Sequence, residues 1–216
     1  AALGYLLQRG VLNRTLGKDI LPPLLVTFGL SILIQNGLLE AFTADSRKLS
    51  LGAIEAQSLA LGPVTVGVIP LMTLASAIAV IFGLNQLFYR TKLGRAFRAT
   101  SDDRVTVQLM GIRPQRVFAM ATGIALVVAT IAALYLGARA NFDPTIGPAR
   151  LLYAFEAVII GGLGSLWGTL AGGMVIGVAQ ALGAAINPEW QILAGHIAFV
   201  IVLLVRPRGL FPRAHD

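Results

Sequence analysis

The chain contains no cysteine among its 216 residues. That absence excludes disulfide bonds, zinc sites with cysteine ligands and thiol chemistry, and it leaves the redox compartment open. Charge is also scarce, because Asp, Glu, Lys and Arg make up 12% of the residues against 56% hydrophobic ones. With a mean hydropathy of +0.78, so little polar surface cannot cover a water-soluble globule. We therefore expect lipid to solvate part of the chain.

The charges that remain are kept out of long stretches of the chain. The runs without Asp, Glu, Lys or Arg are 21–39, 56–89, 117–138 and 157–186. About 20 apolar residues in a helix span the roughly 30 Å hydrocarbon core of a bilayer. The sequence therefore predicts an all-α, polytopic transmembrane helical bundle in a single domain.

The approximate spans that we expect are 21–39, 70–88, 117–136, 152–186 (broken or re-entrant) and 191–205. Residues 1–8 look like the tail of an earlier apolar segment, so we also expect this domain of residues 1–216 to lack its N-terminal spans.

Lys and Arg gather mainly in residues 9–18, 90–116 and 206–213. The positive-inside rule places these stretches, and with them the C-terminus, in the cytoplasm. Topology thus explains the net charge of +7, and nucleic acid is not an expected partner. Between an external residue 150 and an internal residue 206 the number of crossings must be odd. Three crossings, or one re-entrant hairpin and one crossing, both satisfy this condition.

The long basic loop predicts a short amphipathic helix. Thr100, with Asp103 three residues later, resembles a capping box, and Gly111 can end the helix in a left-handed conformation. The apolar face consists of Val105, Leu109 and Ile112. Such a helix either rests on the membrane surface or couples the spans to a cytoplasmic ATPase, and the residues alone leave both interpretations open.

A glycine-rich stretch follows Glu156. Its glycines are Gly161, Gly162, Gly164, Gly168, Gly172, Gly173 and Gly177. The pairs Gly164/Gly168, Gly168/Gly172 and Gly173/Gly177 predict close helix packing. Glycine clusters also occur in broken helices that line a translocation path.

A few polar side chains interrupt the apolar runs. Glu156 either lies at the outer boundary with Arg150 as its partner or lines the path. The Thr27, Ser31 and Gln35 stripe is typical of interhelical hydrogen bonding, although a pore lining would look the same. We interpret His196 as a hydrogen-bonded packing residue rather than a proton relay.

Two other functional classes, an intramembrane serine protease and a proton-coupled secondary carrier, fit these residues less well. Ser165 with His196 would suit an intramembrane serine protease, but Leu166 and Trp167 follow the serine and crowd it. A proton-coupled secondary carrier would need several buried ionisable groups, and only Glu156 and His196 are available.

Four ordered segments resemble the bacterial branched-chain amino acid ABC transporter permease family. They are residues 27–36, 91–112 (TKLGRAFRAT and LMGI), 153–168 (YAFEAVIIGGLGSLWG) and 206–211 (RPRGLF). The resemblance implies the permease subunit of an ATP-driven importer in the bacterial inner membrane, moving branched-chain or related small amino acids, amides or urea. The implied partners are a second homologous permease subunit, two cytoplasmic ATPases that bind ATP and Mg²⁺, and an external solute-binding protein. The subunit itself would carry no cofactor, metal or catalytic residue.

The candidate site residues form two groups, of which the resemblance implies the first and the residue types alone suggest the second. The ATPase-coupling group is Gly94, Arg95, Arg98, Asp102, Asp103, Val105, Leu109, Gly111 and Ile112. The candidates for the translocation path are Thr27, Ser31, Gln35, Glu156, Gly161, Gly162, Gly164 and Ser165.

Overall fold

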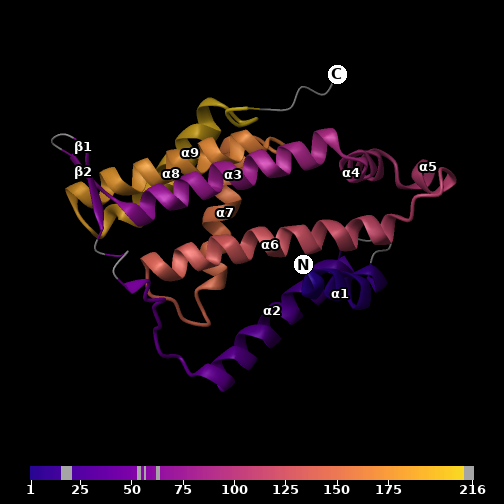
Figure 1. Cartoon of the computed structure of the whole chain (residues 1–216), viewed down its shortest axis with the longest axis horizontal. Coiled ribbons are helices and arrows are strands. Elements are labelled where there is room, and N and C mark those ends of the chain that lie inside the picture. The colour runs from indigo at the N-terminus through magenta and orange to yellow at the C-terminus, as the bar shows by residue number, and fades with distance from the viewer. Residues whose placement is uncertain (16–20, 53–54, 56, 62–63, 212–216) are drawn as a thin grey trace. The chain divides into compact units, whose positions relative to one another are not determined.

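The computed structural model describes residues 1–15, 21–52, 55, 57–61 and 64–211. Helices dominate this part of the chain (Figure 1). They are α1 (Ala2–Gly10), the 3-10 helix η1 (Leu12–Arg14), α2 (Leu21–Phe42), α3 (Val68–Arg90), α4 (Lys92–Asp102), α5 (Arg104–Leu109), α6 (Pro114–Arg139), α7 (Gly147–Gly161), α8 (Leu166–Ile186) and α9 (Trp190–Val205). The prediction of a polytopic, all-α helical bundle is confirmed.

Four helices are long and apolar enough to cross a membrane, namely α2, α3, α6 and α8. They contain 22, 23, 26 and 21 residues, which corresponds to roughly 32–39 Å at 1.5 Å per residue. Helix α9 is apolar but shorter, with 16 residues. Most large hydrophobic side chains on these helices are exposed, as expected of surfaces that face lipid or other subunits.

The chain forms two compact units, which we describe separately. Unit 1 contains Ala1–Ser76 and Asn85–Thr145, and unit 2 contains Ala77–Leu84 and Ile146–Asp216. In unit 1, α1 packs antiparallel on the first half of α6. Gly4 allows this contact, because a Cβ there would lie 2.8 Å from the carbonyl oxygen of Thr122.

A β-hairpin that the sequence reasoning missed precedes α3. Strand β1 (Ser58–Leu61) pairs antiparallel with β2 (Val64–Gly67), with Ser58 opposite Gly67. Figure 1 shows the two arrows at the start of α3. The signal was present, because β2 contains the β-branched residues Val64, Thr65 and Val66. It was concealed because it lies within the long run 56–89 that carries no charge.

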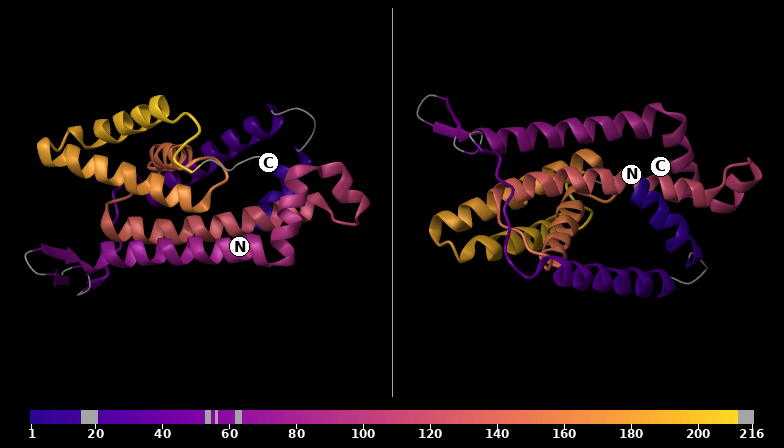
Figure 2. Two further views of the ribbon diagram at one scale, coloured as in Figure 1. Left: turned by 90° about the horizontal axis from the view of Figure 1, so that it is seen from above. Right: turned by 60° about the horizontal axis from the view of Figure 1, so that its bottom comes forward.

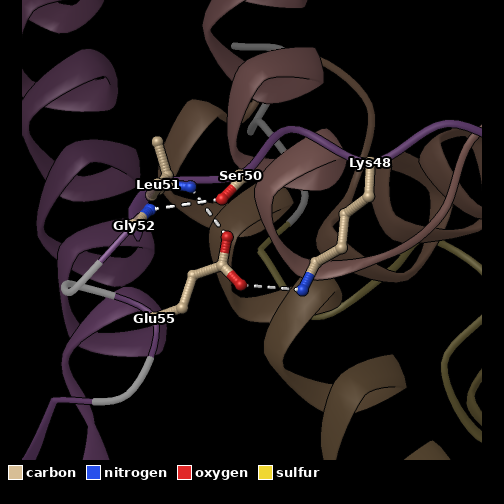
Figure 3. A network of polar contacts seen from close by, with 5 residues as sticks. All are labelled: Lys48, Ser50, Leu51, Gly52 and Glu55. Atoms are coloured by element: carbon tan, nitrogen blue, oxygen red, sulfur yellow. Dashed lines mark hydrogen bonds and ion pairs between the residues drawn. The ribbon is translucent and has the colours of Figure 1, made fainter.

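The loop between α2 and β1 is held by one carboxylate (Figure 3). Glu55 accepts a 2.7 Å hydrogen bond from the Leu51 amide and pairs with Lys48 at 3.0 Å. The Leu51 hydrogen bond first, and then Lys48, lower the pKa of Glu55 below its ordinary value. The same loop reaches the end of α6 through a bridge between Arg47 and Phe142.

Unit 2 is built around α7, α8 and α9. Helices α7 and α8 pack against each other, and so do α8 and α9. The two views in Figure 2 show α8 and α9 as neighbouring helices joined by a short turn. Close packing here depends on small residues, since a Cβ on Gly183 would lie 2.6 Å from that of Ala194.

Candidate functional site

The predicted coupling segment begins at a tight elbow between α3 and α4. Thr91 caps α4: its hydroxyl accepts a 3.1 Å hydrogen bond from the Gly94 amide and donates one of 2.6 Å to the Leu87 carbonyl. A Cβ at Gly94 would fall on the carbonyl oxygens of Leu87 and Phe88. Glycine is therefore required at this position for α4 to turn so closely against the end of α3.

Arg98 fixes the same elbow from the next turn of α4. Its guanidinium donates to the Phe88 carbonyl and lies 5.3 Å from the centroid of the Tyr89 ring. A cation at this carbonyl suits the negative C-terminal end of α3. Phe97 is buried and packs on Phe88, with ring centroids 5.5 Å apart. Arg98 thus has a structural role within the chain.

The coupling segment contains two helices, so the single helix predicted from Thr100 to Gly111 is wrong. Thr100 lies inside α4, 1% exposed, and its hydroxyl donates to the Ala96 carbonyl. Asp103 is extended and caps α5 instead, accepting hydrogen bonds from the amides of Val105 and Thr106. Its carboxylate competes for backbone donors and so interrupts the helix.

The hydrogen bonds that Asp103 accepts also affect its titration. The Thr106 hydroxyl, followed by the amides of Val105 and Thr106, lowers the pKa of Asp103 below the ordinary value.

Gly111 ends this segment in a left-handed conformation with φ +79°, as predicted. Helix α5 buries Val107, which is 3% exposed, and presents an apolar surface on its other side. The most exposed residues of that surface are Val105 (72%), Leu109 (85%) and Met110 (75%). Among the other predicted coupling residues, Arg95 and Asp102 are exposed and Ile112 is partly exposed.

Helices α3 and α6 therefore hold the coupling segment in place within unit 1. The elbow joins it to α3, and both α4 and α5 contact α6. In the second contact the Arg104 guanidinium lies 5.0 Å from the centroid of the Phe118 ring. A force applied to the exposed surface of α5 would reach both α3 and α6.

In unit 2, the glycine-rich stretch forms the turn between α7 and α8. Gly162 and Gly164 have φ of +99° and +86°, so both are turn residues. The Ser165 hydroxyl caps α8 by accepting a 3.0 Å hydrogen bond from the Gly168 amide. The predicted packing pair Gly164/Gly168 is therefore wrong, because Gly164 does not lie in a helix.

The close contact between α7 and α8 uses a different set of small residues. A Cβ on Gly161 would fall on the backbone of Gly168, and a Cβ on Gly172 would fall on the Ala157 carbonyl. The predicted pair Gly168/Gly172 does allow close approach. At Gly173 and Gly177 a Cβ would have no neighbouring atom within 4 Å outside the adjacent backbone, so among the described residues this pair makes no such contact.

The segment after α9 returns to the end of α7. The amides of Leu210 and Phe211 donate to the carbonyls of Ile160 and Gly161 at 2.8 and 3.0 Å. These are carbonyls that the end of a helix leaves without partners. Gly209, at φ +81°, allows the contact, since a Cβ there would lie 2.6 Å from Gly162 Cα. The segment 206–211, one of the four that resemble the permease family, thus provides hydrogen-bond donors for the end of α7.

Glu156 lies inside unit 2, 4% exposed, and contacts His196 of α9 rather than Arg150, which is exposed. The expectation of an Arg150 partner is wrong. His196 contacts Glu156 while the Ser165 hydroxyl caps α8, so these two residues do not form the serine–histidine pair that proteolysis would require. Gly161 and Gly162 lie about one and a half turns further along, at the end of α7 that Leu210 and Phe211 contact.

The polar stripe on α2 shows hydrogen bonds only within its own helix. Thr27 donates to the carbonyls of Pro23 and Leu24, and Asn36 donates to that of Ile32. Helix α2 has no buried residue. The structure thus gives Thr27, Ser31 and Gln35 no interhelical partner within the described part of the chain.

No group of three or more His, Asp or Glu side chains that could hold a metal ion occurs among the described residues. The sequence did not predict the contact between His196 and Glu156, the hydrogen bonds from the segment after α9 to the end of α7, or the β-hairpin. The first two join residues about 40–50 positions apart, and no spacing rule connects such positions.

Comparison with known proteins decides the family. Residues 19–205 match the family model described as the branched-chain amino acid transport system / permease component. The chain belongs to this family. A branched-chain amino acid permease component is a transport protein, so the chain is a membrane permease subunit and not itself an enzyme.

Curated permeases cover nearly the whole chain. The permease protein BraD of the high-affinity branched-chain amino acid transport system of Pseudomonas aeruginosa is 30% identical over 220 residues, covering 99% of this chain and 71% of BraD. LivH of Escherichia coli K12 is 29% identical over the same shares. LivM of E. coli K12 is 27% identical over 147 residues, 66% of this chain and 33% of LivM. No solved structure matches the chain.

Proposed function

We propose that this permease forms part of the transmembrane pathway of an ATP-driven ABC importer in the bacterial inner membrane. Branched-chain amino acids are the expected substrates, and related small amino acids, short amides and urea are the alternatives to test. The family match over residues 19–205 carries the proposal. The chain would act with two cytoplasmic ATPases, which bind ATP and Mg²⁺, and with an external solute-binding protein. Its similarity to both LivH and LivM supports a second, homologous permease subunit as a further partner.

In this proposal, the exposed apolar surface of α5 contacts the ATPase. Large apolar side chains in a polar loop favour a protein partner. Arg95 and Asp102 are exposed on α4 and would provide polar contacts. Arg98 and Asp103, which we expected among these contacts, would instead keep α4 and α5 in place. Movement of the ATPases would then shift α3 and α6 together.

Orientation follows from the distribution of cationic residues. We place the coupling segment and the C-terminal segment in the cytoplasm, because both are rich in Arg. Glu156, Gly161, Gly162, Gly164 and Ser165 would support the shape of the pathway, through the α7 contact and turn, more than bind solute. For Thr27, Ser31 and Gln35 we keep the proposal of a polar lining that a second subunit completes.

The test is reconstitution in proteoliposomes with cognate ATPases and binding protein. We expect ATP-dependent uptake of labelled leucine, isoleucine or valine, with urea and other amino acids as comparison solutes. Complexes with the double variant L109A/M110A should hydrolyse ATP but take up little solute. Complexes with Leu204→Ala, a residue about as exposed on α9, should transport normally. Uptake driven by a proton gradient without ATPases would contradict the proposal and favour a secondary carrier.

A further inference from the structure

Unit 1 contains a polar pocket to which the proposed transport function assigns no role. It has a volume of about 180 Å³ and lies where the end of α1 and η1 meet the start of α6. Its lining residues are Tyr5, Arg9, Asn13, Arg113, Gln115 and Arg116. Figure 1 shows α1 beside the corresponding end of α6. The residues come from segments about 100 positions apart, so only the fold creates the pocket.

A chain of hydrogen bonds fixes one wall of this pocket. The Thr122 hydroxyl donates to Gln8 Oε1 at 2.9 Å, and Gln8 Nε2 donates to Asn13 Oδ1 at 3.1 Å. Asn13 Nδ2 in turn donates to the Gln115 carbonyl at 3.2 Å. Gln8 is buried, at 7% exposure, so its two hydrogen bonds are partly shielded from water, while the bond from Asn13 to Gln115 lies at the surface. The pocket is therefore formed before any ligand arrives.

Its charge is strongly positive. Three of the six lining residues are arginines and none is acidic. Within the described residues, the ion pairs lie elsewhere, at Lys48–Glu55 and Glu156–His196. Like charges in a small space repel each other, and a bound anion would relieve that repulsion. Guanidinium groups match the geometry of phosphate oxygens, to which they can donate in pairs.

The surroundings favour a lipid as the source of that anion. Helix α1, which supplies Tyr5 and Arg9, exposes the apolar side chains Leu3 (76%) and Leu6 (64%). Helix α6 begins at the pocket and continues as an apolar, membrane-length helix. A ligand held by the arginines would thus have aliphatic surface beside it, as basic pockets for lipid headgroups have. We propose that this pocket binds the phosphate of an anionic phospholipid headgroup.

Native mass spectrometry of the full chain in detergent tests the proposal. The protein is titrated with phosphatidylglycerol, phosphatidylcholine or inorganic phosphate, and bound molecules are counted. The wild type should bind phosphatidylglycerol more tightly than phosphatidylcholine. The variant R9Q/R113Q/R116Q should bind phosphatidylglycerol at least roughly tenfold more weakly than the wild type does. The control R14Q/R90Q/K92Q removes three exposed cations that do not line the pocket and should bind as the wild type does.

Two further measurements keep the outcome unambiguous. Far-UV circular dichroism and thermal melting should show all variants folded, as expected since the three arginines are exposed. The variant R9K/R113K/R116K keeps the charge without the paired donors and should lose less affinity than the glutamine variant. Equal phosphatidylglycerol binding by wild type and R9Q/R113Q/R116Q would overturn the site. Equal loss in both glutamine variants would overturn it too. Pocket-dependent binding of inorganic phosphate without phosphatidylglycerol would overturn the lipid assignment.

Discussion

Glu156 Oε1 lies 2.5 Å from His196 Nδ1, joining α7 to α9 inside unit 2. The ring of Tyr153 stacks on that of His196 with centroids 5.5 Å apart and planes 4° from parallel. The other carboxyl oxygen of Glu156 is buried and has no hydrogen-bond partner. Burying an ionisable group costs free energy unless the group is paired. The contact with His196 therefore offsets the cost of burying the Glu156 carboxyl group.

Removal of His196 should therefore destabilise the protein more than neutralisation of Glu156. The His196 side chain is 34% exposed, so we expect His196→Ala to cost about 1–3 kcal/mol, the range for leaving a buried polar group without its partner, and Glu156→Gln to cost less. The double variant should cost less than the sum of both. Melting temperatures in detergent measure this, with Ile197→Ala, about half exposed on the same helix, as the control. Additive effects of the two substitutions would show that the contact carries no coupling.

The glycines of α8 offer a comparison within one helix. Gly168→Ala and Gly172→Ala would force α8 away from α7, because each Cβ would meet backbone atoms. We expect each to cost about 1–3 kcal/mol or more. Gly173→Ala and Gly177→Ala meet open space in this chain and should leave the melting temperature unchanged or raised. If these two substitutions instead reduce co-purification with a second permease subunit, that face of α8 is a subunit contact.

Charge segregation was sufficient to predict the helical class, because a span of about 20 apolar residues is a local property of the sequence. The left-handed Gly111 was predictable for the same reason. The glycines were harder to assign: the pairs Gly168/Gly172 and Gly173/Gly177 have the same spacing, yet only the first pair lies against another helix. Which side of a helix is covered depends on the partner helix, and the sequence pattern does not contain that information.

The coupling segment shows a second limit, in which two local rules compete. Thr100 and Asp103 fit the spacing of a capping box, but Thr91 starts α4 nine residues earlier and Thr100 becomes interior. Asp103 then caps α5 by itself. The decisive factor is the contact of Gly94 with the end of α3, a packing feature that propensity rules do not weigh. The contact between Glu156 and His196 was similarly out of reach.

Asp103 should govern the integrity of α5. Asp103→Ala removes the cap and should loosen the start of α5, whereas Asp103→Asn keeps an acceptor and should have a smaller effect. Hydrogen exchange at the amides of Val105 and Thr106 measures local opening. Asp102→Ala, an exposed neighbour outside the cap, should change neither rate. Equal exchange in Asp103→Ala and the wild type would contradict the capping role.

The same cap predicts a pH dependence. Since the pKa of Asp103 is lowered in the folded protein, its carboxylate stabilises α5 fully above the ordinary pKa of 3.8. That contribution is lost as the pH falls through the lower, folded value. Amide exchange in α5, corrected for its intrinsic pH dependence, should therefore accelerate at acidic pH in the wild type. Asp103→Asn should show no such change.

The crossings of unit 2 can be tested because the chain has no cysteine, so single cysteines can be labelled without background. Helix α8, with 21 residues, is about 32 Å long, enough to cross the hydrocarbon core. Its start lies at the turn that the C-terminal segment seals through Ile160 and Gly161. The turn and the C-terminal segment should therefore face the same side of the membrane, with α8 crossing fully and the shorter α7 and α9, of 15 and 16 residues, crossing where the bilayer thins around them.

We expect Leu163→Cys in the turn and Arg208→Cys in the C-terminal segment to react with an impermeant maleimide from the cytoplasmic side of oriented vesicles. Asn187→Cys, between α8 and α9, should react only from the outside, as should Ser46→Cys in the loop after α2. All three unit 2 positions are exposed, so a lack of reaction would reflect the membrane and not burial in the fold. If Leu163→Cys reacts from neither side while Arg208→Cys reacts from the cytoplasm, α7 and α8 form a re-entrant hairpin and the three-crossing arrangement is wrong.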